Sequence, residues 1–159
     1  MVRLPAIITD QVTGESHAVA LYPADGVPRA LWLAPQGQVM PAGPEVLPEV
    51  WAWSDVMSGV ALLSQPVFEA FVPQMLNYES VGGVNFKKGC YPGQEVVARS
   101  QFRGTLKRRT ARVFSPVALV AGQDIFTPAD PKQPCATVVQ SAARPGGQGF
   151  DALKIGRAH

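Results

Sequence analysis

Short strand-like segments, separated by turns that contain proline or glycine, fill the last third of the chain. They lie at residues 110–114, 124–126, 136–141 and 149–153. Short strands punctuated in this way predict a small β-barrel or sandwich. Because four strands are few for a closed barrel, we expect an open sheet edge, which invites pairing with another chain, including a second copy in a homodimer.

The first two thirds of the chain mix a hairpin with helices. Residues 17–22 and 28–33 predict two strands joined by the turn Pro23-Ala24-Asp25-Gly26, and residues 35–48 predict a loop. Glycines at 59 and 104 are expected to end two of the helices. The predicted helices run from Glu45 or Glu49 to Met57, over residues 66–76, and from Pro92 to Gln101 or Phe102. The fold class expected from these elements is α+β.

The change in character near residue 109 marks the expected domain boundary. Residues 1–108 form one unit and residues 109–153 the β-rich unit. Residues 154–159 do not continue the strand pattern that begins at Phe150, so we expect a tail from cloning or from a shifted reading frame. Both chain ends suggest a fragment of a longer protein.

Composition favours a soluble protein with reduced thiols. Of the 159 residues 47% are hydrophobic, enough for a core, but no run reaches the roughly 18 uninterrupted apolar residues of a membrane span. No secretory signal is evident, which favours the cytoplasm. Cys135 lies in a strand-like run and is expected to be a buried structural thiol. A disulfide between Cys135 and Cys90 is the alternative.

Positive charge is concentrated in one stretch. The net charge is +2, yet seven of the fourteen Lys and Arg residues lie between Lys87 and Arg109, where Glu95 is the only acid. This concentration indicates an anionic partner, such as a carboxylate-rich ligand, a phosphate or RNA. A solvated helix face is the alternative.

The basic stretch contains the one candidate for reactive chemistry, the thiol of Cys90. Lysines at 87 and 88 precede it, and the predicted helix follows. Cationic neighbours and a helix N-terminus both favour a thiolate at neutral pH. Gln94 and Glu95 could satisfy first-turn amides or orient a ligand, and Tyr91 could stack on a ring or simply pack. A buried thiol in a tight turn is the alternative.

Other catalytic chemistry finds little support. Histidines occur only at 17 and 159, so a Cys-His nucleophile is poorly supported. Two cysteines and two scattered histidines do not supply the usual four ligands of structural zinc or an iron–sulfur cluster, so we expect no metal bound by this chain alone. Any cluster would need thiols from a partner.

The segment Lys88-Gly89-Cys90-Tyr91-Pro92-Gly93-Gln94-Glu95 resembles the K-G-C-Y-x-G-Q-E signature of the YgfZ family. These are folate-binding relatives of the glycine-cleavage T-protein that act in iron–sulfur cluster assembly or repair. The flanks at residues 71–77, 82–87, 97–99 and 102–104 are also similar. The resemblance is dense from about Trp51 to Arg109 and diffuse elsewhere.

The resemblance implies a longer, three-domain parent. Residues 1–108 would then be the later part of its central T-protein-like folate-binding domain, and residues 109–153 part of its C-terminal β-barrel. Tetrahydrofolate or a derivative is the implied cofactor, and Trp51 matches a folate-contacting tryptophan. Taken alone, Trp51 is more often a core or helix-face aromatic. The other residues expected at the cofactor are Lys87, Tyr91, Arg99 and Arg103. The functional group would be the Cys90 thiol, supported by Lys88, Tyr91, Gln94 and Glu95.

Two departures from the T-protein pattern argue against aminomethyl transfer. T-protein relatives carry a pterin-contacting acid where this chain has Met57, and an aspartate where it has Cys90. The leading hypothesis is therefore a non-enzymatic or weakly catalytic accessory protein that supports iron–sulfur enzymes, including those that modify tRNA. Its partners would be folate, iron–sulfur client or assembly proteins and, indirectly, tRNA. The alternatives are a folate-dependent aminomethyltransferase and an RNA-binding module that uses Arg99, Arg103 and Lys107.

Overall fold

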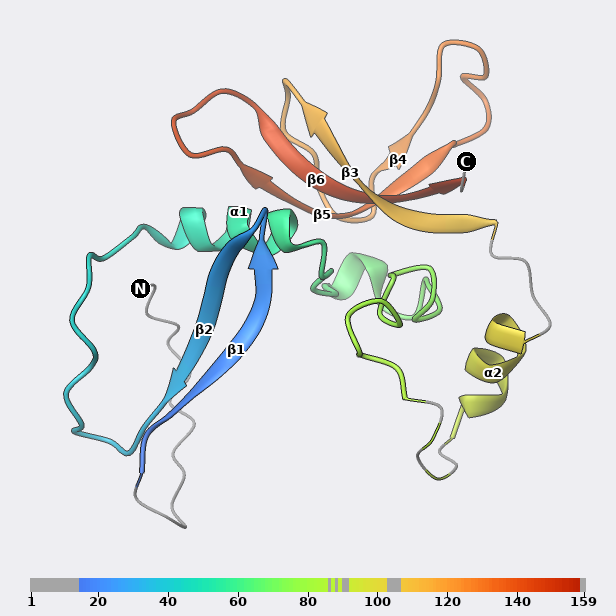
Figure 1. The fold of residues 1–159 in the computed structure, drawn as a ribbon. Helices are drawn as coiled ribbons and strands as arrows, with labels where there is room; N and C mark the ends of the chain where they lie inside the picture. Colours follow the sequence, from blue (N-terminus) through green and yellow to red (C-terminus); the bar gives the residue numbers. More distant parts are fainter. Residues whose placement is uncertain (1–14, 86, 88, 90–91, 103–106, 158–159) are drawn as a thin grey trace.

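A four-stranded sheet curls over one side of a central helix, and a two-stranded hairpin lies on the helix's other side (Figure 1). This computed structural model describes all residues except 1–14, 86, 88, 90–91, 103–106 and 158–159. Helices and strands occupy separate stretches of the chain, and both sheets are antiparallel. The expected α+β class is confirmed.

The larger sheet contains all four strands expected in the last third of the chain. Its strand order is β3-β6-β5-β4. β4 is a short edge strand, whereas β6 is central and pairs with both β3 and β5. Among the described residues the sheet stays open, with β3 and β4 at its edges. The strands run over β3 Arg108–Ser115, β4 Asp124–Ile125, β5 Ala136–Ala143 and β6 Phe150–Arg157.

The expectation that the strand pattern stops at Leu153 is wrong. β6 continues to Arg157, with Ile155 paired to Thr110 on one side and to Thr137 on the other. Leu153 and Ile155 are fully buried on the core side. A central strand gains backbone hydrogen bonds on both edges, and these do not depend on the side chains that interrupt the sequence pattern.

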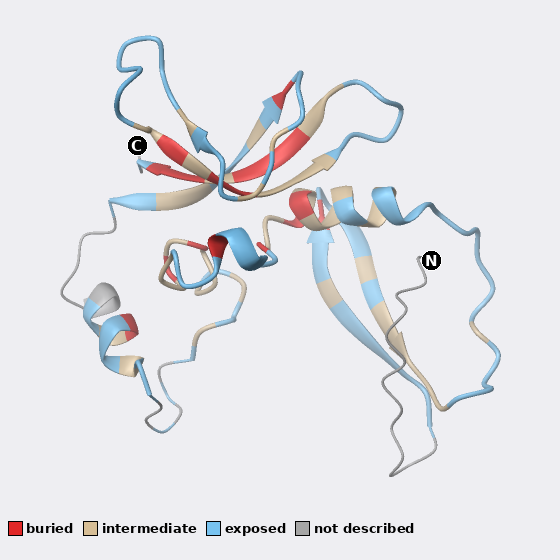
Figure 2. Cartoon of the chain, turned by 180° about the vertical axis from the view of Figure 1, so that it is seen from behind, coloured by how far each residue is buried: buried red, intermediate tan, exposed pale blue. Residues whose placement is uncertain are grey.

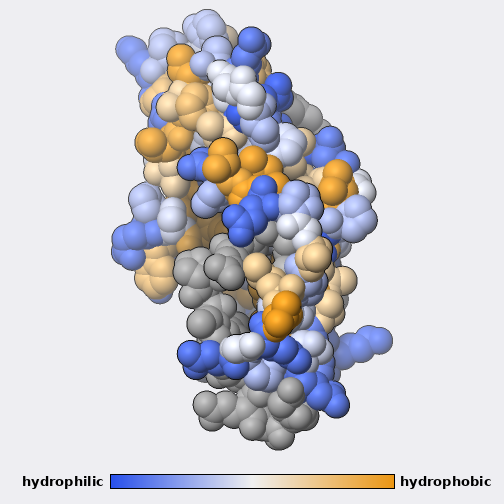
Figure 3. All heavy atoms as spheres, turned by 90° about the vertical axis from the view of Figure 1, so that its left-hand side faces the viewer, coloured by the Kyte–Doolittle hydropathy of each residue, from blue (hydrophilic) through white to orange (hydrophobic). Residues whose placement is uncertain are grey.

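The hairpin agrees with the sequence prediction. β1 (His17–Ala24) pairs with β2 (Val27–Leu33), and Ala20 lies opposite Ala30. Asp25 and Gly26 make the turn with positive φ angles of 50° and 82°, the backbone that a tight two-residue hairpin turn requires. Figure 3 faces this side of the molecule and shows apolar patches interspersed with hydrophilic residues.

The central helix α1 (Pro48–Ser58) confirms the prediction for this segment. Pro48 occupies the first turn, where its missing N–H costs nothing. Gly59 ends the helix in the left-handed conformation, at φ 74°, and its N–H donates to the carbonyl of Val56 at 3.1 Å. Both ends of α1 are therefore set by local chemistry.

The helix predicted over residues 66–76 is wrong. A short 3-10 helix, η1 (Gln65–Val67), gives way to extended backbone at Phe68 and then to a series of turns. Pro73 lacks an N–H and restricts the residue before it, so a continuous helix would break here. The prediction that this segment buries apolar side chains is correct, because Phe71, Met75 and Leu76 all pack in or against the core.

The core lies between α1, the turn segment and the concave side of the sheet. Figure 2 shows buried residues concentrated on β5, β6 and the end of α1. Phe71, Met75, Tyr78 and Ala142 pack against the core from its margin. Its buried members are Val56, Ala61, Val67, Leu76, Val139, Leu153 and Ile155.

Candidate functional site

The helix that follows the cysteine motif begins later than the sequence predicts. α2 spans Gln94–Phe102, and Gly93, at φ 83°, accepts the N–H of Val96 at 3.2 Å. Pro92 therefore lies before the helix and not in its first turn. Cys90 is four positions before the first helical residue, and the helix-dipole effect falls off within about one turn. Of the predicted site residues, Cys90, Lys88, Tyr91 and Arg103 lie outside the described residues.

One buried amide joins α2 to the turn segment before it. The Gln74 side chain is fully buried, and its Nε2 donates to the carbonyl of Val97 at 2.6 Å. Val97 is itself buried. The Oε1 atom of Gln74 is buried without a hydrogen-bond partner among the described atoms. This contact holds the first turn of α2 against the body of the molecule.

The described motif residues around α2 face solvent to different degrees. Lys87, Glu95 and Arg99 are exposed, and Gln94 is half-buried. The backbone N–H of Lys87 donates to the Asn85 side-chain oxygen at 2.8 Å. The structure therefore gives the motif an accessible, positively charged margin.

Trp51 lies on α1, away from the motif. Its indole is half-buried, and the guanidinium of Arg29 stacks over the ring at 4.4 Å from its centre. Arg29 also donates to the carbonyl of Ser54 at 3.2 Å and pairs with the Asp55 carboxylate. In Figures 1 and 2, α1 and α2 lie on opposite sides of the intervening turn segment. The structure does not bring Trp51 together with Lys87 or Arg99.

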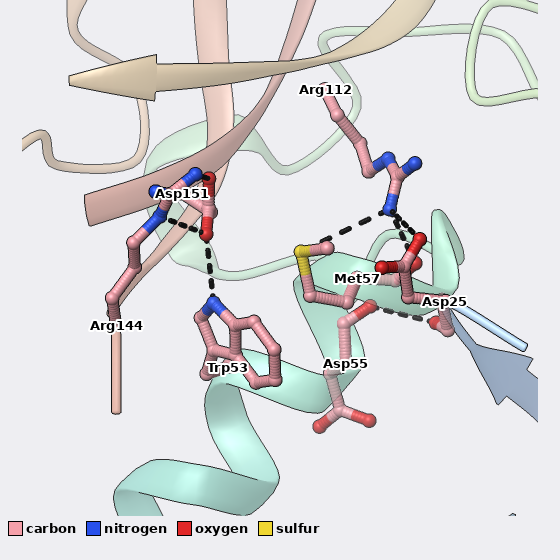
Figure 4. Close-up of polar contacts among 8 residues, drawn as sticks. Asp25, Trp53, Asp55, Met57, Arg112, Arg144 and Asp151 are labelled. Carbon is pink, nitrogen blue, oxygen red and sulfur yellow. Dashed lines mark hydrogen bonds and ion pairs between the residues drawn. The ribbon is translucent and has the colours of Figure 1, made fainter. Parts of the chain in front are cut away.

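A second tryptophan of α1 connects the helix to the sheet (Figure 4). The Nε1 of Trp53 donates to Asp151 Oδ2 at 2.8 Å, and Arg144 donates to both Asp151 oxygens at 2.7 and 2.8 Å. The hydrogen bond from Arg144, together with that from Trp53, lowers the pKa of the Asp151 carboxyl against the opposing effect of burial. Asp151 is therefore held as a carboxylate between α1 and β6.

A hollow of about 280 Å³ opens where the hairpin tip, the end of α1 and β3 meet. One Arg112 nitrogen lies 3.3 Å from the Asp25 carboxylate and 3.2 Å from the carbonyl of Met57. Figure 4 shows Arg112 reaching toward Met57 and Asp25 from the strand above. The hollow is lined by Asp25, Met57, Ser58, Gly59, Asn77, Thr110, Ala111, Arg112 and Leu153.

Hydrogen bonds connect the turn segment beside this hollow to the start of β3. Asn77, at φ 57°, donates to the carbonyl of Thr110 at 3.1 Å, and Thr110 donates to the carbonyl of Met75 through both its N–H and its hydroxyl at 2.8 Å. Arg109 pairs with Glu79 at 3.0 Å. The turn segment thus runs along the edge of β3 and holds Asn77 at the hollow.

Sequence reasoning missed the charged residues of the hollow. Asp25 is a turn residue and Arg112 a strand residue, 87 positions apart. Of the residues that line the hollow, only Met57 was linked to ligand binding from the sequence, because it stands where T-protein relatives carry an acidic residue. Of the residues predicted to bind a cofactor, the three that the structure describes, Trp51, Lys87 and Arg99, do not line the hollow.

The remaining sequence expectations concern the second thiol, metals and membranes. Cys135 is a free thiol, half-buried rather than buried, directly before β5. Within the described residues, His, Cys, Asp and Glu nowhere gather in a group of three or more that could hold a metal ion. No helix in the same part of the chain is long and apolar enough to cross a membrane.

Two curated proteins match a stretch of 58 residues, a length similar to that of the dense resemblance around the cysteine motif. The protein from Edwardsiella ictaluri (strain 93-146) is 45% identical over this stretch, and that from Cronobacter sakazakii (strain ATCC BAA-894) is 47% identical. Both are called tRNA-modifying protein YgfZ. Over this stretch the chain is similar to YgfZ proteins.

The YgfZ match is partial. It covers 36% of this chain and 18% of each relative. No protein-family model matches the chain. The similarity to YgfZ therefore rests on one stretch of 58 residues, and the activity of the whole relatives is not transferred by the match alone.

Proposed function

We propose that this chain is part of a YgfZ-type accessory protein that supports tRNA modification through iron–sulfur enzymes. Cys90 would be its working group and a reduced folate its cofactor. The observation that carries the proposal is the identity of 45–47% to two relatives called tRNA-modifying proteins. The K-G-C-Y-x-G-Q-E motif, which contains Cys90, supports it from the sequence.

The hollow beside Met57 is the proposed place for one part of the folate. Its volume of about 280 Å³ is just below the roughly 300–1,000 Å³ typical of small-molecule pockets. It would therefore take a ring or a carboxylate-bearing end, not a whole folate. Asp25 and Asn77 offer acceptor oxygens, and Arg112 offers N–H donors.

These residue types suit either end of a folate, one at a time. With the pterin in the hollow, Asp25 would accept N–H groups of its edge, the task that Met57 cannot perform. With the glutamate end there instead, Arg112 would pair with a carboxylate. A bound tetrahydrofolate would supply a carrier for one-carbon units. Arg29 covers one face of the Trp51 ring, so a folate ring cannot stack on that face. We therefore assign folate binding to the hollow.

The proposed role of Cys90 rests on its charged surroundings. Lys87 is exposed, and Lys88 lies two positions before Cys90 in the sequence, so cations favour the thiolate even though α2 begins four positions after Cys90. A thiolate is both a nucleophile and a ligand for iron or sulfur-bearing cargo. Persulfide, cluster and one-carbon exchange all remain open roles for it.

The test in cells compares the two cysteines. The open reading frame that encodes this chain, carrying Cys90→Ala, is expressed in cells that lack their own YgfZ, and tRNA modifications made by iron–sulfur enzymes are measured by mass spectrometry. We expect Cys90→Ala to lose the rescue and Cys135→Ala to keep it. Normal modification with Cys90→Ala would remove this thiol from the mechanism.

A chemical measurement tests the thiolate directly. In the Cys135→Ala chain, the rate of alkylation of Cys90 is followed against pH. We expect a midpoint below the ordinary thiol value of about 8.5. A midpoint at or above that value would show that the lysines do not activate the sulfur.

A further inference from the structure

The register of β3 and β6 places two arginines directly opposite each other. Arg108 begins β3 and Arg157 ends β6, and the two are cross-strand partners. Both side chains are exposed. In an antiparallel pair, opposing Cβ atoms lie about 4.5–5.5 Å apart, and like charges in this position are destabilising. The register therefore places two like-charged residues on the same face of neighbouring strands, an arrangement that lowers stability.

Neighbouring cations are neutralised, but this pair is not. Arg109 pairs with Glu79 at 3.0 Å, and Arg112 pairs with Asp25 at 3.3 Å. Within the described residues, no ion pair involves Lys107, Arg108 or Arg157, and Lys107 is also exposed. We call Lys107, Arg108 and Arg157 the basic end of the sheet.

The basic end lies on the same side of the molecule as α2. Figures 1 and 2 both show the start of β3, the C-terminal end of β6 and α2 at this side. The exposed Arg99 of α2 thus adds a fourth unpaired cation to the same side. A surface with several unpaired cations attracts a polyanion and relieves its own repulsion when one binds.

We propose that the basic end binds the phosphate backbone of RNA, with tRNA as the RNA concerned. The choice of tRNA rests on the proposed function. Arginine forks bind phosphate oxygens in a bidentate manner, and two neighbouring forks suit successive phosphates better than a single carboxylate. The side chains lie at an exposed sheet end and not in a pocket, so they contact backbone and do not read bases.

The first experiment measures binding of the full chain to a transcribed tRNA by fluorescence anisotropy over a range of salt concentrations. For Arg157→Gln we expect about fivefold weaker binding near 0.1 M salt, and a log–log salt slope smaller by about 0.7–0.9, the loss of one phosphate contact. Lys132→Gln removes an exposed cation from the loop before β5 and is the matched control, expected to change neither quantity.

A charge reversal separates binding from folding. Arg108→Glu would replace the repulsion with a cross-strand ion pair to Arg157, so thermal stability should stay equal or rise while tRNA affinity falls by more than in Arg157→Gln. Arg157→Lys keeps the charge and should retain most of the salt slope. Unchanged affinity in both Arg157→Gln and Arg108→Glu would overturn the proposal.

Competition identifies the class of partner. Polyglutamate and unlabelled tRNA are each used to displace the labelled tRNA. We expect polyglutamate to need a far higher concentration, counted in negative charges, than unlabelled tRNA. Equal displacement would assign the basic end to acidic proteins and overturn the proposal. Binding to the basic end is proposed to be independent of Cys90, so the two proposals can fail separately. If Cys90→Ala loses the rescue while Arg157→Gln and Arg108→Glu both keep their tRNA affinity, the basic end is rejected and the proposed function stands.

Discussion

At the scale of single residues, Asp151 shows how one buried carboxylate connects three parts of the fold. It accepts hydrogen bonds from Trp53 of α1 and from Arg144 of the β5–β6 connection. Arg144 in turn stacks on the ring of Phe114 in β3, with its guanidinium 4.4 Å from the ring centre. Removing the negative charge should therefore affect the whole sheet.

We predict that Asp151→Asn lowers the free energy of unfolding at pH 7 by about 1–3 kcal/mol, because two donors lose a charged acceptor. The pKa of Asp151 is lowered in the folded state, so its stabilising effect is present above the unfolded value of about 3.9 and is lost as pH falls through the folded value. Urea unfolding at pH 7 and pH 3 should show the difference shrinking at the lower pH. Glu45→Gln, at an exposed position, is the control. A pH-independent difference would contradict this account.

We predict that Gly149→Ala costs clearly more stability than Gly146→Ala. Both glycines have positive φ, 83° and 91°, which costs an alanine about 1–2 kcal/mol. Only at Gly149 would the added Cβ also lie 2.6 Å from the Phe114 ring and 2.7 Å from the Ser115 carbonyl. Thermal melts of the two variants separate the two effects, and equal melting temperatures would show that the ring moves aside freely.

At the scale of elements, one buried arginine side chain makes several contacts between the hairpin and α1. The Arg29 side chain is only 8% exposed and contacts Trp51, Ser54 and Asp55. A two-stranded hairpin is marginally stable alone, so its docking on α1 maintains its structure. The hairpin tip also supplies Asp25 to the hollow, and the attachment therefore serves the proposed folate site.

We predict that Arg29→Met frees the hairpin without unfolding the sheet. The change removes the stacking on Trp51 and leaves Asp55 half-buried without its partner, at a cost of about 1–3 kcal/mol. Amide hydrogen exchange should increase in β1 and β2 while β5 and β6 keep their protection. Arg112→Met, whose ion pair is largely exposed, should leave hairpin exchange much less affected. Uniform loss of protection across both sheets would mean that the hairpin is part of the global unfolding unit.

At the scale of the whole molecule, packing is uneven. β6 pairs on both edges and buries Leu153 and Ile155, whereas Val97 is the one buried apolar side chain among those described in α2. Elements with few buried contacts open at lower free energy than the core. The helix α2 is therefore less constrained by packing than β6.

We predict that the amides of α2 exchange with solvent well before those of Leu153 and Ile155. Hydrogen exchange followed by mass spectrometry on the intact chain measures both. Gln74→Leu, which removes the hydrogen bond to Val97, should speed exchange in α2 and leave β6 unchanged. Protection of α2 as strong as that of β6 would show that the helix folds as part of the core.

Local sequence predicted much of this fold. Both strands of the hairpin, the helix that ends at Gly59 and all four strands of the larger sheet follow from turn residues, caps and apolar alternation. The motif around Cys90 likewise pointed to the similarity with YgfZ proteins, because a short motif is read directly from the order of its residues.

Long-range pairing decided the rest. The turns around Pro73, the extension of β6 to Arg157, the hollow between Asp25 and Arg112, and the opposed arginines at 108 and 157 join residues that are distant in sequence or have ambiguous local patterns. Local propensity is worth tenths of a kcal/mol for most residues, whereas burial and two-sided strand pairing contribute more and act only once the chain has folded. The sequence by itself therefore determined most of the elements and the similarity to YgfZ, and the tertiary structure alone decided which charges meet.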